Sequence, residues 1–519
     1  MLKACSPEAR YSLVAASLLL QLATPAAMAQ TAAINPNTTY QVISGFGGHN
    51  GAGWIPTLTA AQVDTAFGTG PGQIGLTIMR MRIDASSAQW QQQVSAAQLA
   101  KAKGAKLFAT PWSPPPYMKT SNSLIHGSLI PSFYPDYATH LLDFAAFMKS
   151  NAAELYAISL QNEPDWDPDY EGCQWTSQNF IDFLNSQGAR FGSLKLMAPE
   201  SFSFRKTLSD PILNDAGAAA KLSIVAGHLY GTTPSDYPLA TSKGKQVWST
   251  EHYTDSTSDA NNWTMALPVG VELHRAMAAN YSAYVWWYIR RAYGLITEDG
   301  NVSKRGYIMS QYAKYIRPGY TRIDATVKPW YDVLLTSYKG GDGRIVMVAV
   351  NNGAYQRHVD FSFAAGAPRT FWKYSTTASL NNAYTGESTV VGGVTSADLE
   401  PLSVTTFVSQ PTVTDASGGV RIAQSGLTVN RFTGQFSGTV SFTNTGATPI
   451  SGSTLQFELE GLSPGVTLDN KTGEVNGVPY ITLPNTTIAP GATVTLQTTF
   501  GNPSKASIVY TPKLYSIIY

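Results

Sequence analysis

Charge and cysteine are both scarce in this 519-residue sequence. Only 13% of the residues are charged, about half the ~25% usual for soluble proteins, and 35 basic side chains are balanced by 34 acidic ones. A nucleic-acid binder needs a basic face, and a long disordered chain needs high net charge and few aromatic residues. The composition excludes both classes, and the length suggests two to four domains at about 100–200 residues each.

Long apolar runs are also missing, since no stretch beyond the first 30 positions approaches the ~18 apolar residues of a membrane span. Lys3 and Arg10 precede a short apolar run at 11–22, and an A-x-A site stands at 27–29. Residues 1–29 are therefore predicted to be a signal peptide. Its removal takes away Cys5 and leaves Cys173 without an intrachain disulfide partner. We expect a secreted protein, extracellular or periplasmic, that is monomeric and does not bind membranes.

The middle of the chain alternates short apolar runs with amphipathic stretches. Eight strands are predicted at 42–45, 76–83, 106–110, 155–161, 194–198, 222–227, 246–250 and 284–288. Helices are predicted at 60–67, 95–103, 137–151, 176–188 and 270–279. This rhythm favours an α/β fold of the (β/α)8 barrel type over residues 46–317, with a doubly wound sheet as the competing arrangement.

The character of the sequence changes to all-β after Gly319. Strand-like runs separated by Gly, Asn and Ser clusters continue to about residue 410, and the segment 39–43 is expected to join them. Past the break at 410–412, alternating apolar and polar residues with turns about every 10 residues predict an immunoglobulin-like all-β domain over 411–519. This tail contains no Trp, so a spacer or packing role is favoured over sugar binding.

Two motifs match known ligand loops only in part. The GPGQIG segment at 70–75 precedes a predicted strand, whereas a dinucleotide loop follows a strand and opens a helix. The D-x-D-x-D segment at 165–169 has Tyr170 where a calcium loop needs Gly and Thr176 where it needs Glu. The histidines show no metal-ligand spacing, so we expect no cofactor and no catalytic metal.

Three glutamates follow predicted strands at the end of a barrel where catalysis takes place: Glu163, Glu200 and Glu251. A carboxyl group with a raised pKa can act as an acid, while a second, ionised carboxylate attacks the anomeric carbon of a sugar. Strands four and seven face each other across the mouth, which favours Glu163 with Glu251. A pair that includes Glu200 remains open on spacing alone.

Aromatic residues are plentiful, with 11 Trp and 27 Tyr, and many follow the same predicted strands. Their apolar faces and polar tips suit a polysaccharide, although any one of them could instead pack in the core. The residues at or just beyond strand ends are Trp54, Trp112, Trp166, Trp286, Trp287, Tyr117, Tyr230, Tyr253 and Tyr293.

Several motifs in order resemble family 30 of the glycoside hydrolases: GFGG at 45–48, ATPWSPP at 109–115, LQNEPD at 160–165, GHLYG at 227–231 and TEHY at 250–253. The segments VWWYIRRAYG at 285–294 and SKRGY at 303–307 are similar to its bacterial glucuronoxylanase subgroup. The resemblance runs from about residue 40 to 408. It implies a (β/α)8 barrel with a side-associated β-sandwich, here residues 30–45 and 318–410, and retention of anomeric configuration without a metal.

The resemblance also implies roles for individual residues. Glu163 corresponds to the acid/base and Glu251 to the nucleophile, while Asn162 corresponds to the residue that binds the sugar 2-hydroxyl. Glu200 then becomes a supporting residue. The implied activity is endo-cleavage of β-1,4-xylan in glucuronoxylan, with xylo-oligosaccharides bearing glucuronate branches as the bound partners.

Arg291 corresponds to the arginine that holds the (methyl)glucuronic acid branch in this subgroup. Its planar guanidinium can bind a carboxylate through two parallel hydrogen bonds. The accompanying pocket residues are implied to be Tyr253, Ser256, Trp287, Tyr288 and Tyr293. Two alternatives remain: Arg291 could pair with Glu298 or Asp299, and the protein could be a family 30 xylanase or glucanase independent of glucuronate. A non-catalytic polysaccharide-binding protein is the alternative from another class.

Overall fold

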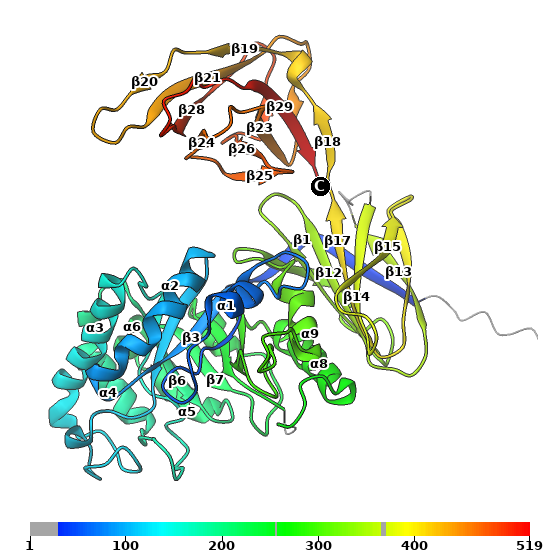
Figure 1. Ribbon diagram of the computed structural model, residues 1–519. Helices are drawn as coiled ribbons and strands as arrows, with labels where there is room; N and C mark the ends of the chain where they lie inside the picture. Colours follow the sequence, from blue (N-terminus) through cyan, green and yellow to red (C-terminus); the bar gives the residue numbers. More distant parts are fainter. Residues whose placement is uncertain (1–29, 255–256, 365–369) are drawn as a thin grey trace, which may run out of the picture.

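The computed structural model describes residues 30–254, 257–364 and 370–519 (Figure 1). The predicted signal peptide therefore lies outside the described residues. Eight parallel strands form a closed barrel: β2 (Gly45–His49), β3 (Ile78–Ile83), β4 (Lys106–Pro111), β5 (Ala157–Ser159), β6 (Lys195–Ser201), β7 (Leu222–His228), β8 (Gln246–Glu251) and β9 (Ala283–Tyr288). The predicted (β/α)8 barrel is confirmed, and the doubly wound sheet is wrong because β2 pairs with β9 and closes the ring.

The first barrel strand lies three residues later than the sequence pattern predicts. Val42 ends strand β1 (Gln30–Val42) of another sheet, and the barrel strand is the glycine-rich β2. A Cβ atom on Gly47 would stand 2.3 Å from the carbonyl oxygen of Ile78 on β3. Glycine is thus required here for close strand approach, and its lack of a side chain hides the strand from a pattern based on hydrophobicity.

Helices cover the outside of the barrel, and several begin where the sequence offers caps. Thr59 and Thr176 each form a capping box, with Gln62 and Asn179 respectively. The helices are α1 (Ala60–Phe67), α2 (Val94–Ala102), α3 (Tyr134–Ser150), α4 (Ser177–Gln187), α5 (Lys206–Asn214), α6 (Ala216–Lys221), α7 (Pro238–Ser242), α8 (Trp263–Ala278) and α9 (Lys304–Ala313). None of the helices in the described part of the chain has the length and apolarity of a membrane span.

Two cores support the barrel from opposite sides of its wall. Inside the ring, Phe108 and Trp248 pack with small and branched residues such as Ala157 and Ile224. Outside it, strand residues such as Met79 pack against the helices. Since successive strand residues point to opposite faces, each strand contributes to both cores. The filled interior leaves the carboxyl ends of the strands as the open surface of the barrel.

A nine-stranded sheet lies beside α8 and α9, in the order β15-β14-β17-β12-β11-β10-β1-β13-β16 (Figure 1). Its N-terminal strand β1 runs antiparallel to β10 and parallel to β13. Thr406 of β17 donates to the backbone oxygen of Gln311 on α9 at 2.7 Å. The remaining strands are β10 (Thr321–Ala325), β11 (Val333–Lys339), β12 (Ile345–Asn351), β13 (Arg357–Phe363), β14 (Thr370–Thr376), β15 (Ala383–Thr389), β16 (Val394–Leu399) and β17 (Ser403–Gln410).

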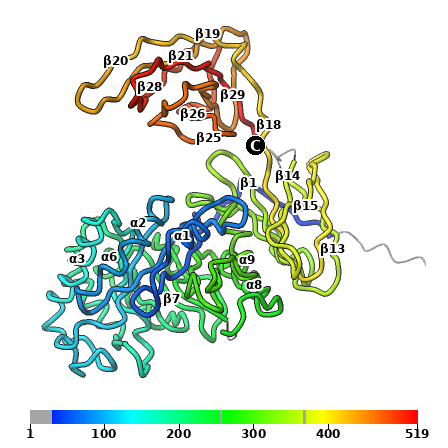
Figure 2. The backbone as a smooth tube through the Cα atoms, viewed as in Figure 1, coloured from blue at the N-terminus to red at the C-terminus, as the bar shows by residue number. Residues whose placement is uncertain are grey.

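The C-terminal region forms two further sheets around a separate apolar core that includes Phe442, Phe457 and Leu514. Figure 2 shows it joined to the rest of the chain at β18. One sheet contains β18 (Thr412–Asp415), β29 (Thr511–Ile518), β23 (Thr454–Glu460), β26 (Val478–Thr482) and β25 (Gly473–Val475). The other contains β19 (Val420–Gln424), β20 (Thr428–Val429), β21 (Phe436–Asn444), β28 (Thr493–Gly501) and β24 (Thr467–Leu468), and β22 (Ile450–Ser451) pairs with β27 (Thr487–Ile488).

Candidate active site

The three predicted glutamates meet at the carboxyl end of the barrel. Glu163 follows β5, Glu200 lies in β6 and Glu251 is the last residue of β8. The backbone N–H of Glu163 donates to the carbonyl oxygen of Glu200 at 3.1 Å. Glu163 and Glu200 have φ values of 44° and 54°, a left-handed conformation that costs a non-glycine residue about 1–3 kcal/mol. Backbone strain is thus concentrated at the two positions that aim these carboxyl groups.

Glu163 and Glu251 are close enough to act on one bond. Each is 5% exposed, and a carboxylate oxygen of one lies within 4.8 Å of a carboxylate oxygen of the other. Retaining glycosidases hold their two carboxyl groups about 5–5.5 Å apart, whereas inverting enzymes need about 6.5–9.5 Å to admit a water molecule. The separation fits a double displacement through a covalent intermediate.

His228, the last residue of β7, lies between the carboxyl groups and is fully buried. Its Nδ1 stands 2.9 Å from Oε1 of Glu163 and 3.8 Å from Oε2 of Glu251. Its Nε2 lies 3.7 Å from Oε1 of Glu200. Burial opposes the charged imidazole, but the carboxylates of Glu251, Glu163 and Glu200 outweigh it and raise the pKa of His228 to about 9.

Arg80 of β3 is the second buried cation of the site. Its guanidinium donates to Oε2 of Glu251, to Oδ1 of Asn162 at 2.7 Å and to Oε1 of Glu200 at 3.3 Å. Burial opposes the ionisation of Glu200, but Arg80 and His228 together outweigh it and lower the pKa of Glu200 to about 2. Glu200 is also fully buried and accepts from Thr110 at 2.9 Å, so it serves as a fixed counter-ion rather than facing a substrate.

The site is electrically neutral when one carboxyl group carries a proton, and Glu163 is the group that its surroundings favour. Burial and then the charge of Glu251 raise the pKa of Glu163, although the hydrogen bond from His228 opposes the shift. Tyr170 donates to the other oxygen of Glu163 at 3.2 Å. With Arg80 and His228 charged, ionised Glu200 and Glu251 complete the balance.

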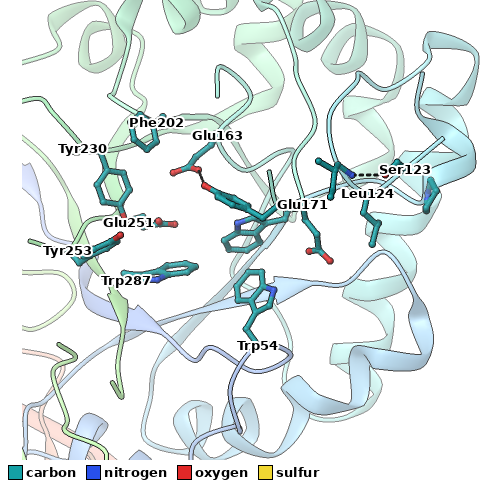
Figure 3. Close-up of a pocket in the computed structure, with 14 residues that line it drawn as sticks. Trp54, Ser123, Leu124, Glu163, Glu171, Phe202, Tyr230, Glu251, Tyr253 and Trp287 are labelled. Carbon is teal, nitrogen blue, oxygen red and sulfur yellow. Dashed lines mark hydrogen bonds between the residues drawn. The ribbon is translucent and has the colours of Figure 1, made fainter. Parts of the chain in front are cut away.

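A cleft of about 950 Å³ opens over these carboxyl groups, as Figure 3 shows. Tyr230 donates to Oε1 of Glu251 at 2.7 Å, and Trp54 is 38% exposed at the other side of the cleft. The lining residues are Trp54, Trp112, Pro116, Ser123, Leu124, Ile125, Glu163, Tyr170, Glu171, Phe202, Tyr230, Glu251, Tyr253 and Trp287. Its size and its aromatic walls suit several sugar units in a row.

Not every predicted aromatic residue lies in this cleft. Trp286 is fully buried in the outer core, because its neighbour Trp287 takes the inward direction and adjacent strand residues point to opposite faces. Trp166 instead stacks on Phe202 at 4.8 Å between ring centroids, and Tyr117 packs edge-on against Phe133. The prediction that the whole aromatic set gathers at one mouth is wrong for Trp286.

The predicted branch pocket adjoins the cleft through Tyr253. The ring of Tyr253 lies 5.2 Å from that of Tyr293, which lies 6.3 Å from that of Tyr288. The guanidinium of Arg291 stands 5.8 Å from the Tyr288 ring and 3.6 Å from Oε1 of Glu298. The alternative pairing with Glu298 is therefore present, although both side chains are 42–50% exposed. Ser256 lies outside the described residues.

Arg290 donates to the backbone oxygen of Pro56 at 2.9 Å, and its Nε lies 3.7 Å from Oε2 of Glu298, so the two arginines share this carboxylate. Asp299 accepts from Thr297 and Asn301. Arg291 thus has the more exposed guanidinium of the two arginines, and Glu298 is the acid beside it.

Arg80, His228 and Tyr170 are functional residues that the sequence analysis did not select. Arg80 and Arg82 stand in the fully buried strand β3, and a charged residue within a buried run is itself a signal of a polar site. His228 lies in a quoted motif at a strand end, which could also have indicated it. Tyr170 lies in a loop and carries no such signal.

Glu163, His228 and Glu251 are the group in the described part of the chain whose donor atoms lie close enough together to share a metal ion. A pKa of about 9 keeps His228 protonated at neutral pH, and a protonated nitrogen cannot be a ligand. Arg80 also occupies an oxygen of Glu251. The donor set is better suited to moving protons than to holding a cation.

No family model matches the chain. Glucuronoxylanase XynC of Bacillus subtilis strain 168 is 42% identical over 397 residues, which cover 74% of this chain and 93% of that protein. The family 30 subfamily 8 xylanase Xyn30A of Clostridium acetobutylicum is 38% identical, with a TM-score of 0.69 over 73% of this chain and 99% of that one. A family 30 endoxylanase of Clostridium papyrosolvens C71 is 35% identical, with a TM-score of 0.67 and 73% and 100% coverage.

Proposed function

The chain belongs to glycoside hydrolase family 30, and from that premise we propose that it is a retaining endo-1,4-β-xylanase that cuts glucuronoxylan. The observation that carries the proposal is the pair Glu163 and Glu251, buried under an aromatic cleft with carboxylate oxygens within 4.8 Å. The relatives named glucuronoxylanase and family 30 xylanase support the substrate class.

In the first step Glu251 attacks the anomeric carbon of the xylose unit above it, while Glu163 protonates the departing glycosidic oxygen. The C1–O bond to the leaving chain breaks as the bond from C1 to Glu251 forms. Arg80 and Tyr230 donate to the two oxygens of Glu251, which fixes the orientation of the attacking carboxylate. Asn162, fixed by Arg80, is the residue proposed to bind the sugar 2-hydroxyl.

In the second step ionised Glu163 removes a proton from water, and the resulting hydroxide displaces Glu251 from C1. The two inversions restore the original anomeric configuration. Protonated His228 at 2.9 Å stabilises Glu163 in this anionic state, after Glu251 has been neutralised in the covalent intermediate. One carboxyl group thus serves as acid and then as base, since the charge beside it changes between the steps.

The cut site is proposed to be set by a glucuronic acid branch bound at Arg291, beside Tyr288 and Tyr293. A half-exposed pair with Glu298 at 3.6 Å is weak, about 0–1 kcal/mol, so a uronate carboxylate can replace it. The same contact favours the second candidate function, a family 30 xylanase independent of the branch, if Glu298 keeps Arg291 occupied.

Digestion of glucuronoxylan beside an arabinoxylan free of uronic acid distinguishes the two candidates. We expect products that each carry one glucuronate by mass spectrometry, and arabinoxylan left nearly intact. Arg291→Ala should lower kcat/KM on glucuronoxylan about 10–100-fold, the range for a lost charge-assisted contact of about 1.5–3 kcal/mol. Arg431→Ala, on the exposed hairpin of the C-terminal region, is the control. Equal cleavage of both polymers would leave a xylanase without branch recognition.

We also propose that the protein is secreted and acts as a monomer, since its polymeric substrate cannot enter a cell. The segment at 1–29, with its A-x-A site, supports export. Sequencing of the N-terminus of the protein recovered from the culture medium, with sedimentation of that sample, tests both statements. A mature protein that begins at Gln30 is the expected result.

A further inference from the structure

A hydrogen-bonded group behind the cleft connects the strand of Glu251 to the helix layer. Oε1 of Glu272, on α8, accepts from the hydroxyl of Tyr284 at 2.6 Å, and the same oxygen lies 2.7 Å from Nδ1 of His252. Tyr284 is fully buried in β9, and His252 directly follows Glu251 at the end of β8. A carboxylate oxygen only accepts, so Nδ1 of His252 carries the proton. One oxygen atom thereby joins α8 to two adjacent barrel strands.

His252 in turn contacts both neighbours of the Glu251 carboxylate. Its ring lies 5.2 Å from the ring of Tyr230, the residue that donates to Glu251. Its backbone oxygen accepts from the N–H of Trp287 at 3.0 Å, and Trp287 lines the cleft beside Glu251 (Figure 3). The imidazole of His252 thus packs against the donor on one side of Glu251, and its backbone holds the residue of the aromatic wall on the other.

The hydrogen bond between His252 and Glu272 is needed to hold the imidazole in place, because there is empty space beside it. A cavity of about 430 Å³ adjoins both His252 and Glu272 and is lined also by Leu229 and Thr254. Without the bond to Glu272 the imidazole has room to rotate into this cavity, and Tyr230 loses the ring against which it packs. Displacements of about 1 Å at a reacting group can cost ~10²-fold in rate.

We propose that Glu272 is a positioning residue for the nucleophile: through His252 it fixes Tyr230, Trp287 and hence the carboxylate of Glu251. The inference rests on the proposed function, because it assigns Glu251 as the attacking group. Glu272 does not line the cleft, so its effect falls on kcat and leaves substrate affinity nearly unchanged.

Glu272→Ala is expected to lower kcat on glucuronoxylan about 10–100-fold, with KM within twofold of the wild-type value. Glu272→Gln retains an oxygen that can accept from both Tyr284 and His252, and it should recover kcat to within about threefold. Asp332→Ala is the matched control: it removes a partly buried carboxylate, 10% exposed, that is bound by Arg357 in the side sheet, far along the chain from the cleft. Its kcat should equal that of the wild type, and melting temperatures are recorded for every variant.

Equal kcat losses in the Ala and Gln variants, or a loss in Asp332→Ala that follows the melting temperature, would overturn the positioning role. A wild-type kcat in Glu272→Ala would do the same. Failure of the proposed function looks different, because the wild-type protein itself then fails to cleave glucuronoxylan. In that case the same series is measured on the xylan that it does cleave.

Discussion

The mouth of the barrel and the C-terminal region bury opposite kinds of side chain. At the mouth, Arg80, Glu200 and His228 are each fully buried, and both cations lie beside Glu200, Arg80 at 3.3 Å and His228 at 3.7 Å. The C-terminal core consists of Val, Leu, Ile and Phe, and its ion pairs, such as Lys471–Glu474, lie at the surface. The second arrangement is the one that folding stability alone favours, since removing charges from water costs several kcal/mol each.

The difference indicates that the barrel mouth contains buried charges that lower folding stability but are needed for the proposed reaction. Buried charges persist only if they are paired and hydrogen-bonded, and every carboxylate at the mouth has at least one cationic neighbour. The apolar C-terminal core contains no comparable network among the described residues. The comparison predicts that equivalent substitutions have unequal effects in the two regions.

The largest contrast is expected from removing one carboxylate oxygen in each region. Glu251→Gln should lower kcat on glucuronoxylan by about 10⁴-fold or more, because an amide cannot act as the nucleophile. Glu460→Gln alters a carboxylate that accepts from Tyr515 at 2.8 Å in the C-terminal region, and it should leave kcat unchanged. Kinetics on purified, folded variants check both. A Glu251→Gln enzyme with near-normal turnover would remove the nucleophile assignment.

The next effect concerns stability against pH. The pKa of His228 is raised from 6.5 to about 9, so its stabilising contribution is fully present below about pH 6.5 and is lost as the pH rises through 9. The expected loss is about 3 kcal/mol. The pKa of Glu200 is lowered from 4.5 to about 2, so its contribution is present above pH 4.5 and disappears as the pH falls through 2.

Denaturant unfolding followed by tryptophan fluorescence, repeated at several pH values, measures the unfolding free energy against pH. The signal reports on the barrel and the side sheet alone, because the last tryptophan is Trp372. His228→Asn should flatten the plot of unfolding free energy against pH between pH 6.5 and 9. A wild-type curve that is already flat over this interval would contradict the buried, charged imidazole.

The smallest effect is expected from removing residues 411–519. No residue lining the cleft comes from this region, and the barrel and side-sheet cores contain no residue beyond Val408. Turnover of soluble glucuronoxylan should therefore stay within about twofold of the full-length value. Initial rates of the two proteins at equal concentration test this, and a tenfold loss would show that the C-terminal region acts on the cleft.

Local sequence patterns predict an element correctly where the residues next to it in sequence determine its structure. Helix α1 was predicted at its observed bounds, because Thr59 and Gln62 form a cap next to an amphipathic run. The glycine-rich strand β2 was misplaced, since its shape depends on Ile78 of the next strand. Short, capped helices can thus be predicted from sequence, whereas close backbone contacts between strands cannot.

The meeting of Glu163, Glu200 and Glu251 at one mouth could be predicted from sequence because strand ends in a barrel share one face, whereas the choice of Glu163 and Glu251 as the reacting pair came from the family resemblance. Arg80 was not predicted, since its partner Glu251 lies 171 residues away and only the closed ring brings them together. Arg291 could not be assigned a single partner from the sequence. Both a uronate carboxylate and Glu298 were predicted as partners, and the structure contains the pair with Glu298. Which partner wins depends on the substrate, which the chain alone does not contain.

The position of β1 inside the side sheet, between β10 and β13, has a consequence for biosynthesis. Ala33 donates to Thr326, 293 residues further along the chain, and β1 also pairs with β13. The whole barrel is thus an insertion between the first strand of this sheet and its remaining strands. Strand β1 therefore stays unpaired until β10, which ends at Ala325, has been made, and its second partner β13 ends at Phe363. An unpaired strand is prone to associate with other chains. Correct folding of β1 therefore depends on strands that the same chain supplies only after the whole barrel.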